Sequence, residues 1–163
     1  MIKVKFGDKE FKDYWKIIKI PTAVLIAWSI LGLITAIISF SIYMSIFTPT
    51  VSWMLMLVVF GFVGWITVKD FKGKIGMAAW AGAITGAITG LISAIAGIIM
   101  INAVPQVVET AIAQATTQGA NPEIIESFMS IGVYVGLLTG PLFSGVIGAV
   151  ISAISGFIAT KIK

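Results

Sequence analysis

Three long stretches of the chain contain no Asp, Glu, Lys or Arg, and they constrain the fold more than any other feature. They cover residues 20–68, 75–108 and 127–160. Each is longer than the ~20 apolar residues that cross the hydrocarbon layer of a bilayer as a helix. A soluble protein that is 58% hydrophobic and 11% charged would leave many apolar side chains facing water. The sequence therefore predicts an integral membrane protein.

The first charge-free stretch is too long for one membrane span, and it breaks at Thr48-Pro49-Thr50. Two spans are expected there and one in each of the other stretches. A first helix ending at residue 47 would be about 40 Å long, so we expect it to tilt or protrude. The predicted fold is an all-α bundle of four transmembrane helices in a single membrane domain, with helices over residues 21–47, 51–68, 75–101 and 131–160.

The segment before the first span, residues 1–19, is predicted to form a separate interfacial helix. Asp8 can accept hydrogen bonds from the free N–H groups of a first turn. Phe11, Tyr14 and Ile18 then recur at helical spacing among lysines, a pattern typical of a helix that lies on a membrane surface. The alternative is a helix that docks on a partner protein.

Lysines lie at only one side of the predicted membrane topology. They precede the first span, separate the second from the third, and follow the fourth, whereas the two remaining connections contain none. The positive-inside rule then places both termini and the central connection in the cytoplasm of a multi-pass protein of the cell membrane. Membrane lipids are the expected partners of these lysines, and nucleic acid is not expected.

The connection over residues 102–130 is predicted to be helical and to extend outside the membrane. Gly119 suits the residue after a helix end, and Asn121 followed by Pro122 suits the start of the next helix. One interpretation is a helical hairpin in which the third and fourth helices continue outward. The alternative follows from Pro105, which removes a backbone hydrogen bond: residues 104–118 would then lie across the bundle as a lid.

Small residues recur every four positions in the last two predicted helices. Such rows, often called glycine zippers or GxxxG motifs, let two helix backbones approach closely in lipid. They predict tight, right-handed crossing of the third and fourth helices, or of two protomers, near −40°. The alternative is a pore lined by small residues. The predicted packing residues are Gly82, Gly86 and Gly90 in the third helix, and Gly132, Gly136, Gly140, Ser144, Gly148, Ser152 and Gly156 in the fourth.

Hydroxyl groups and one proline mark a candidate solute pathway. Thr85, Thr89 and Ser93 lie one turn apart on the third helix, and Pro141 interrupts the fourth helix. Hydroxyls in membrane helices commonly bond to their own helix, and a proline can be a passive kink, so both features also have purely structural explanations. A broken helix can instead expose carbonyl groups to a solute.

The chain lacks the residue types that most enzymes and metal sites require. It contains no cysteine and no histidine, and no acidic residue lies in a predicted span. Neither catalysis nor a metal or other cofactor is expected. We therefore expect a structural or accessory membrane protein that forms a homo-oligomer or belongs to a larger membrane complex. The alternative is a passive channel or facilitator for a small neutral or cationic solute.

Overall fold

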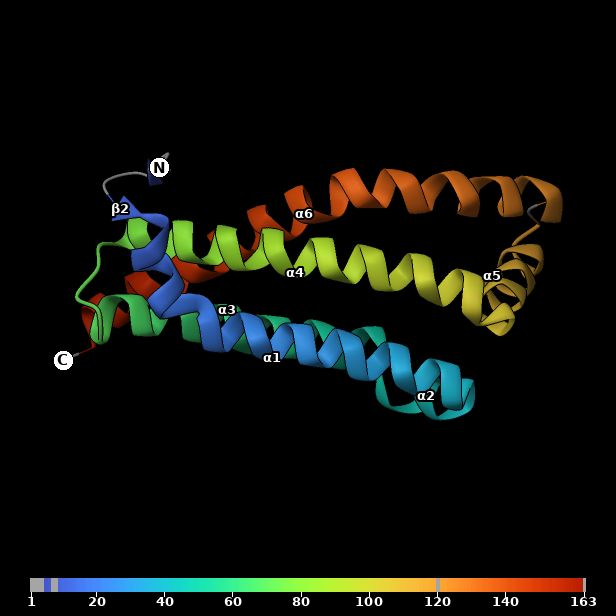
Figure 1. Cartoon of the computed structure of the whole chain (residues 1–163), viewed down its shortest axis with the longest axis horizontal. Coiled ribbons are helices and arrows are strands. Elements are labelled where there is room, and N and C mark those ends of the chain that lie inside the picture. Colours follow the sequence, from blue (N-terminus) through green and yellow to red (C-terminus); the bar gives the residue numbers. More distant parts are fainter. Residues whose placement is uncertain (1–4, 7–8, 120, 163) are drawn as a thin grey trace.

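The computed structural model describes residues 5–6, 9–119 and 121–162 and is almost entirely helical in these ranges (Figure 1). A short antiparallel pair, β1 (Lys5–Phe6) and β2 (Lys9–Glu10), precedes the helices. The helices are α1 (Phe11–Ile38), α2 (Phe40–Ile46), α3 (Pro49–Lys69), α4 (Ile75–Ala103), α5 (Pro105–Thr117) and α6 (Pro122–Lys161).

Four of these helices are long and apolar enough to cross a membrane, as the charge-free stretches predicted. They are α1, α3, α4 and most of α6. The prediction of an all-helical bundle with four such helices is confirmed. The long helices lie side by side, and the most extensive contact is between α4 and α6 (Figure 1).

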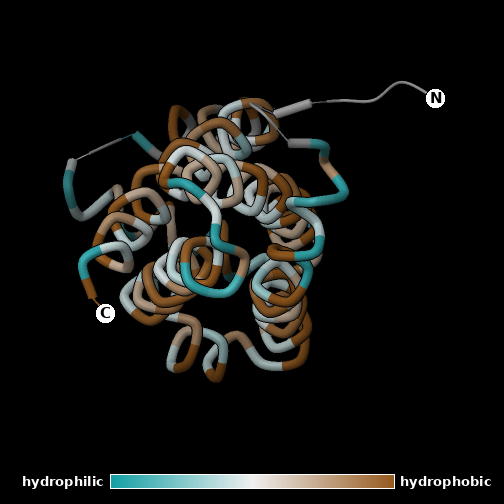
Figure 2. The backbone as a smooth tube through the Cα atoms, turned by 90° about the vertical axis from the view of Figure 1, so that its left-hand side faces the viewer, coloured by the Kyte–Doolittle hydropathy of each residue, from teal (hydrophilic) through white to brown (hydrophobic). Residues whose placement is uncertain are grey.

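The two ends of the bundle differ in composition. The start of α1, the connection between α3 and α4, and the end of α6 lie together at one end, which we call the lysine end (Figure 1). Figure 2 views this end and shows hydrophilic residues gathered there. The opposite end, which we call the far end, carries α2 and α5. The charges are therefore segregated along the long axis of the molecule.

α1 differs from the predicted arrangement, because the segment before residue 20 and the first span form one helix. α1 runs without interruption through Pro21, and Tyr14 and Ile18 are buried in the bundle core. The predicted cap Asp8 lies outside the described residues. At the observed start, a carboxylate oxygen of Asp13 accepts a hydrogen bond from the backbone N–H of Glu10 at 3.4 Å.

The first span also ends earlier than residue 47. Ser39 has an extended backbone, with φ −156° and ψ 103°, and separates α1 from α2. The ring of Phe47 packs on that of Trp28, with 4.5 Å between centroids. In a continuous helix these residues would lie about 28 Å apart along the axis, at 1.5 Å per residue. Residues 21–47 therefore do not form one helix: α1 ends at Ile38, and α2 folds back against it.

In the predicted connection between the third and fourth helices, the third helix stops and only the fourth continues. α4 ends at Ala103, Val104 is buried in a non-helical conformation, and Pro105 begins a separate helix, α5, at the far end (Figure 1). α6 instead runs without interruption from Pro122 to Lys161, through the predicted end of the connection at residue 130. The chain therefore has the break at Pro105 on which the alternative interpretation depends, and the hairpin outside the membrane stays a prediction.

The turn before α6 follows the predicted pattern. Gly119 has φ +84°, a left-handed conformation that an L side chain would strain. Pro122 is the first residue of α6, and the carbonyl of Asn121 accepts a hydrogen bond from the N–H of Ile125 at 3.2 Å. The local sequence signals for a helix end and a helix start are therefore both confirmed.

Candidate functional site

The backbones of α4 and α6 touch along the half of their contact nearest the lysine end. A Cβ added at Gly82 would fall on the carbonyl oxygen of Gly148, and one added at Gly86 would fall on that of Ser144. At Gly90 the added Cβ would lie 2.7 Å from the carbonyl oxygen of Gly140. Only glycine leaves room for this approach, so the structure brings these predicted packing residues together across one interface.

α3 joins this contact through a glycine that the four-residue rows did not include. A Cβ at Gly64 would fall on the carbonyl oxygen of Ser152. The hydroxyl of Ser152, which is fully buried, donates to the carbonyl of Phe60 at 2.8 Å, and that of Ser155 donates to Gly61 at 2.6 Å. Two interhelical hydrogen bonds therefore hold α6 against α3. The sequence signal for this position was slight: one pair of glycines at residues 61 and 64 in an otherwise bulky span.

The remaining predicted packing residues divide into two groups. Gly156 lies near α4, with an added Cβ 3.0 Å from the Cβ of Ala78. Gly132 and Gly136, by contrast, would each gain a Cβ with no atom of the described chain within 4 Å. These two glycines take no part in the contact between α4 and α6. Among the described residues, the row of small residues in α6 therefore packs against other helices only from Gly140 toward the lysine end.

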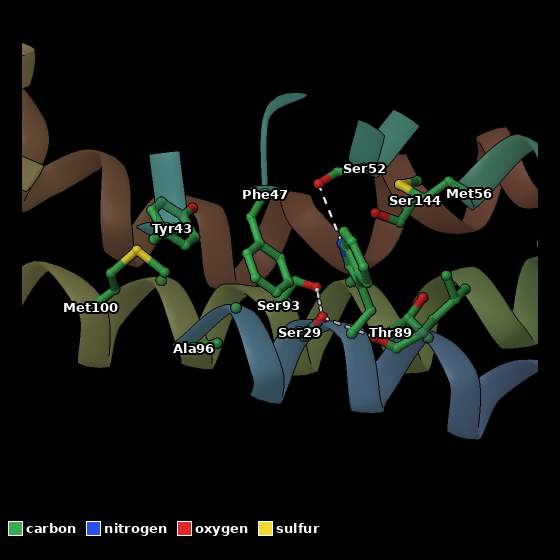
Figure 3. Close-up of a pocket in the computed structure, with 15 residues that line it drawn as sticks. Ser29, Tyr43, Phe47, Ser52, Met56, Thr89, Ser93, Ala96, Met100 and Ser144 are labelled. Carbon is green, nitrogen blue, oxygen red and sulfur yellow. Dashed lines mark hydrogen bonds between the residues drawn. The ribbon is translucent and has the colours of Figure 1, made fainter. Parts of the chain in front are cut away.

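Where α4 and α6 separate, the helices form an open cavity of about 340 Å³ (Figure 3). Tyr43 and Met100 lie at one end of it, and Thr89 and Ser144 at the other. All four long helices and α2 contribute to the lining. The lining residues are Leu25, Trp28, Ser29, Gly32, Tyr43, Phe47, Ser52, Met56, Thr89, Gly90, Ser93, Ala96, Gly97, Met100 and Ser144.

Hydrogen bonds between helices fix the polar side chains of this cavity (Figure 3). The indole N–H of Trp28 donates to the hydroxyl of Ser52 at 3.3 Å. The hydroxyls of Ser29 and Ser93 lie 3.0 Å apart. Because Ser29 also donates to the carbonyl of Leu25 at 3.1 Å, Ser93 is the donor to Ser29. α1 is thus linked to both α3 and α4 at the level of the cavity.

Two of the four predicted pathway residues lie at the cavity. Thr89 and Ser93 line the cavity. Thr85 is fully buried outside the cavity lining, and its hydroxyl has no hydrogen-bond partner among the described residues. Pro141 lies inside α6, which continues through it, so the predicted interruption of the helix does not occur. Sequence reasoning missed the aromatic wall of Trp28 and Phe47, which exists because α2 folds back.

The chemistry available in the cavity is that of neutral groups. Serine and threonine hydroxyls, an indole, a phenol, a phenyl ring and two thioethers face it, and its lining contains no carboxylate or ammonium group among the described residues. No group of three or more potential metal-binding side chains occurs in the part of the chain that the structure describes. The cavity can offer apolar surface and hydrogen bonds to an uncharged molecule.

Tightly packed side chains separate this cavity from the lysine end. Tyr14 and Ile18 of α1 are buried against Val63 of α3 and Ala81 and Ile84 of α4. The backbone contacts at Gly82 and Gly86 lie on the same side of the cavity. A packed core therefore lies on the lysine side of this cavity.

Comparison of the chain with known protein families, with curated proteins and with solved structures finds no significant match to any of them.

Proposed function

We propose that the chain is a structural or accessory membrane protein without catalytic activity. One observation supports this above the others: the backbones of α3, α4 and α6 are in direct contact at Gly64, Gly82 and Gly86. Packed glycine backbones in lipid gain van der Waals contact along their length and leave little space for water. A bundle filled in this way suits a role in which the helices hold a fixed shape for their neighbours.

The proposed placement is in the cell membrane with the lysine end in the cytoplasm. The start of α1, the connection between α3 and α4, and the end of α6 contribute Lys16, Lys72 and Lys161. The positive-inside rule assigns an end of this kind to the cytoplasm. α5 and the start of α6 would then lie at the outer surface or beyond it. Large apolar side chains such as Leu138 and Val146 are exposed on the long helices, as expected for faces that contact lipid.

The proposed partners are a second copy of the chain or a larger membrane complex. α6 presents Gly132 and Gly136 with open space around them. In lipid, such positions allow a helix of another molecule to approach the backbone. This part of the glycine row makes no contact with α4, and it is the part of the molecule that best suits association with another helix.

Reconstitution tests the proposed role. The purified chain in liposomes should show no flux of glycerol or potassium above that of protein-free liposomes. Cross-linking in native membranes should give one fixed assembly, which Gly136→Leu should weaken and Ile95→Phe, a change of an exposed apolar side chain on α4, should not. Rapid flux from the purified protein would contradict a purely structural role.

The cavity supports a second candidate function, a facilitator for a small neutral solute. Its hydroxyls and its volume of about 340 Å³ fit an uncharged molecule, and pockets of a few hundred Å³ are typical of small-molecule sites. If glycerol flux is observed, Ser93→Phe should abolish it by filling the cavity. Ile95→Phe, a change on the exposed side of the same helix, is the control and should preserve flux. Equal flux in the two variants would exclude this route.

A further inference from the structure

A second cavity lies at the lysine end, between the start of α1 and the connection from α3 to α4. Its volume is about 810 Å³. It is formed by three parts of the chain that are distant in sequence: the first turns of α1, the connection, and the first turns of α4. The lining residues are Asp13, Tyr14, Lys16, Phe71, Lys72, Gly73, Lys74, Gly76, Met77 and Trp80.

The charge around this cavity is predominantly positive. Lys16, Lys72 and Lys74 contribute three ammonium groups, and Asp13 contributes one carboxylate. That carboxylate accepts a hydrogen bond from the backbone N–H of Glu10, so part of its charge is directed at the start of α1. None of the three lysines forms an ion pair with another described residue. The cavity therefore has a surplus of positive charge that an anion could neutralise.

The lysines are held at the cavity by an ordered connection. The N–H of Gly73 donates to the carbonyl of Thr67 at 2.8 Å, and that of Phe71 donates to Ile66 at 3.2 Å. These bonds tie the connection to the last turns of α3. Lys72 and Lys74, which flank Gly73, line the same cavity as Lys16 of α1.

The other lining residues are apolar and aromatic. Trp80 and Phe71 are exposed, and Met77 is partly buried beside them. Tryptophan and lysine together are typical of the layer where bilayer headgroups meet hydrocarbon. A cavity of this kind suits a ligand that is anionic at one end and apolar at the other.

We propose that this cavity binds the phosphate group of an anionic phospholipid, with the phosphate among Lys16, Lys72 and Lys74 and the glycerol and first acyl carbons against Trp80 and Met77. The inference rests on the proposed membrane placement, but it does not depend on the accessory role or on the first cavity. Phosphate is also available as a free anion, so the test separates these two sources.

The test uses the full chain in mild detergent, with phosphatidylglycerol and phosphatidylcholine added in equal amounts. Native mass spectrometry measures how much of each lipid stays bound. The cavity variant combines Lys16→Gln, Lys72→Gln and Lys74→Gln. The control variant combines Lys12→Gln, Lys19→Gln and Lys161→Gln, which removes the same charge from exposed lysines at the same end but outside the cavity lining. Circular dichroism verifies that both variants are folded.

We expect the cavity variant to bind about tenfold less phosphatidylglycerol and the control variant to lose less than about twofold, since each lysine near a headgroup contributes measurably to its attraction. Phosphatidylcholine binding should not change. Millimolar inorganic phosphate identifies the source: displacement of the lipid from the parent chain shows that phosphate alone is recognised, and retention of the lipid shows that its apolar part is needed. Equal loss in both variants, or no loss in either, would overturn the proposed site.

Discussion

The two halves of the contact between α4 and α6 follow the same sequence pattern but pack in opposite ways. From Gly140 toward the lysine end, glycines meet backbone, whereas from Gly140 toward the far end Gly136 and Gly132 meet no described atom within 4 Å. A four-residue row advances 400° and so drifts about 40° around the helix at each step. Two nearly straight helices that cross can therefore share such a row over only part of its length.

The position of α3 explains which half of the small-residue row in α6 is packed against other helices. Toward the lysine end, α3 holds α6 through the hydrogen bonds of Ser152 and Ser155 and through the close approach at Gly64. Toward the far end, α2 and the aromatic pair of Trp28 and Phe47 lie beside the cavity. The comparison shows that small-residue spacing identifies a helix face, while the neighbouring helices decide where that face is buried.

The largest expected effect is that of Gly86→Leu. A Cβ at this position would fall on the carbonyl oxygen of Ser144, a backbone atom that cannot rotate away. Overpacking usually costs about 1–3 kcal/mol, and we expect at least the upper end of that range here. Thermal unfolding in detergent, followed by circular dichroism, measures the change.

Gly97→Leu is the matched control for this prediction, because it lies on the same helix and its added Cβ would meet no atom within 4 Å. It should shift the unfolding temperature much less than Gly86→Leu. If the two variants unfold at the same temperature, the backbone contact in the lysine half does not stabilise the fold.

Ser152→Ala should have the next largest effect. It removes the buried hydrogen bond to the carbonyl of Phe60 while leaving the helix backbones unchanged. Hydrogen bonds between membrane helices average about 0.6 kcal/mol and reach about 1.7 kcal/mol, and full burial favours the upper part of this range. Thr139→Val, which removes a bond within α6 on the exposed far half, should cost close to nothing. Chemical denaturation of both variants tests the difference.

Charge-free stretches and local caps allowed most of the fold to be predicted from the sequence. Absence of charge over 75–108 and the signals at Gly119 and Pro122 act within single segments, so they identify α4 and the start of α6 without knowledge of the neighbours. The merging of the first helix with its predicted interfacial segment was missed. Tyr14 and Ile18 have the same helical spacing whether they face lipid or protein, and only the position of α3 and α4 decides between these environments.

The cavity was harder to predict from the sequence than the helices were. Thr89 and Ser93 were predicted from their hydroxyls, but the wall opposite them depends on the reversal at Ser39, which has neither proline nor glycine to mark it. At Pro141 the local sequence favours a break or a passive kink, and α6 continues through it. Neighbouring helices can compensate a proline in a membrane helix, and no local pattern records that compensation.

The hydrogen bond between α1 and α4 at the cavity should contribute less to the free energy of unfolding. Ser29→Ala and Ser93→Ala each remove one side of a hydrogen bond whose hydroxyl oxygens are 3.0 Å apart. A double-mutant cycle on unfolding free energies should give a coupling of about 0.5 kcal/mol, near the average for such bonds. Zero coupling would show that the two helices are held at this level by packing alone. A coupling larger than the destabilisation caused by Ser152→Ala would reverse the ranking of the two halves.

Gly136→Leu should have the smallest effect on the stability of the isolated chain. Its spacing makes it equivalent to Gly86 and Gly148 in the sequence, yet a Cβ here would meet no described atom within 4 Å. A leucine side chain would then extend into detergent or lipid, and it should also raise helix propensity by removing a glycine from the interior of α6. We expect the unfolding free energy of the monomer to stay within about 0.5 kcal/mol of the parent value. If Gly136→Leu instead destabilises the monomer as much as Gly86→Leu does, the far halves of α4 and α6 must close on each other in the folded protein. The open packing of the far half would then belong to one conformation of the protein, and the neighbouring helices would not be its cause.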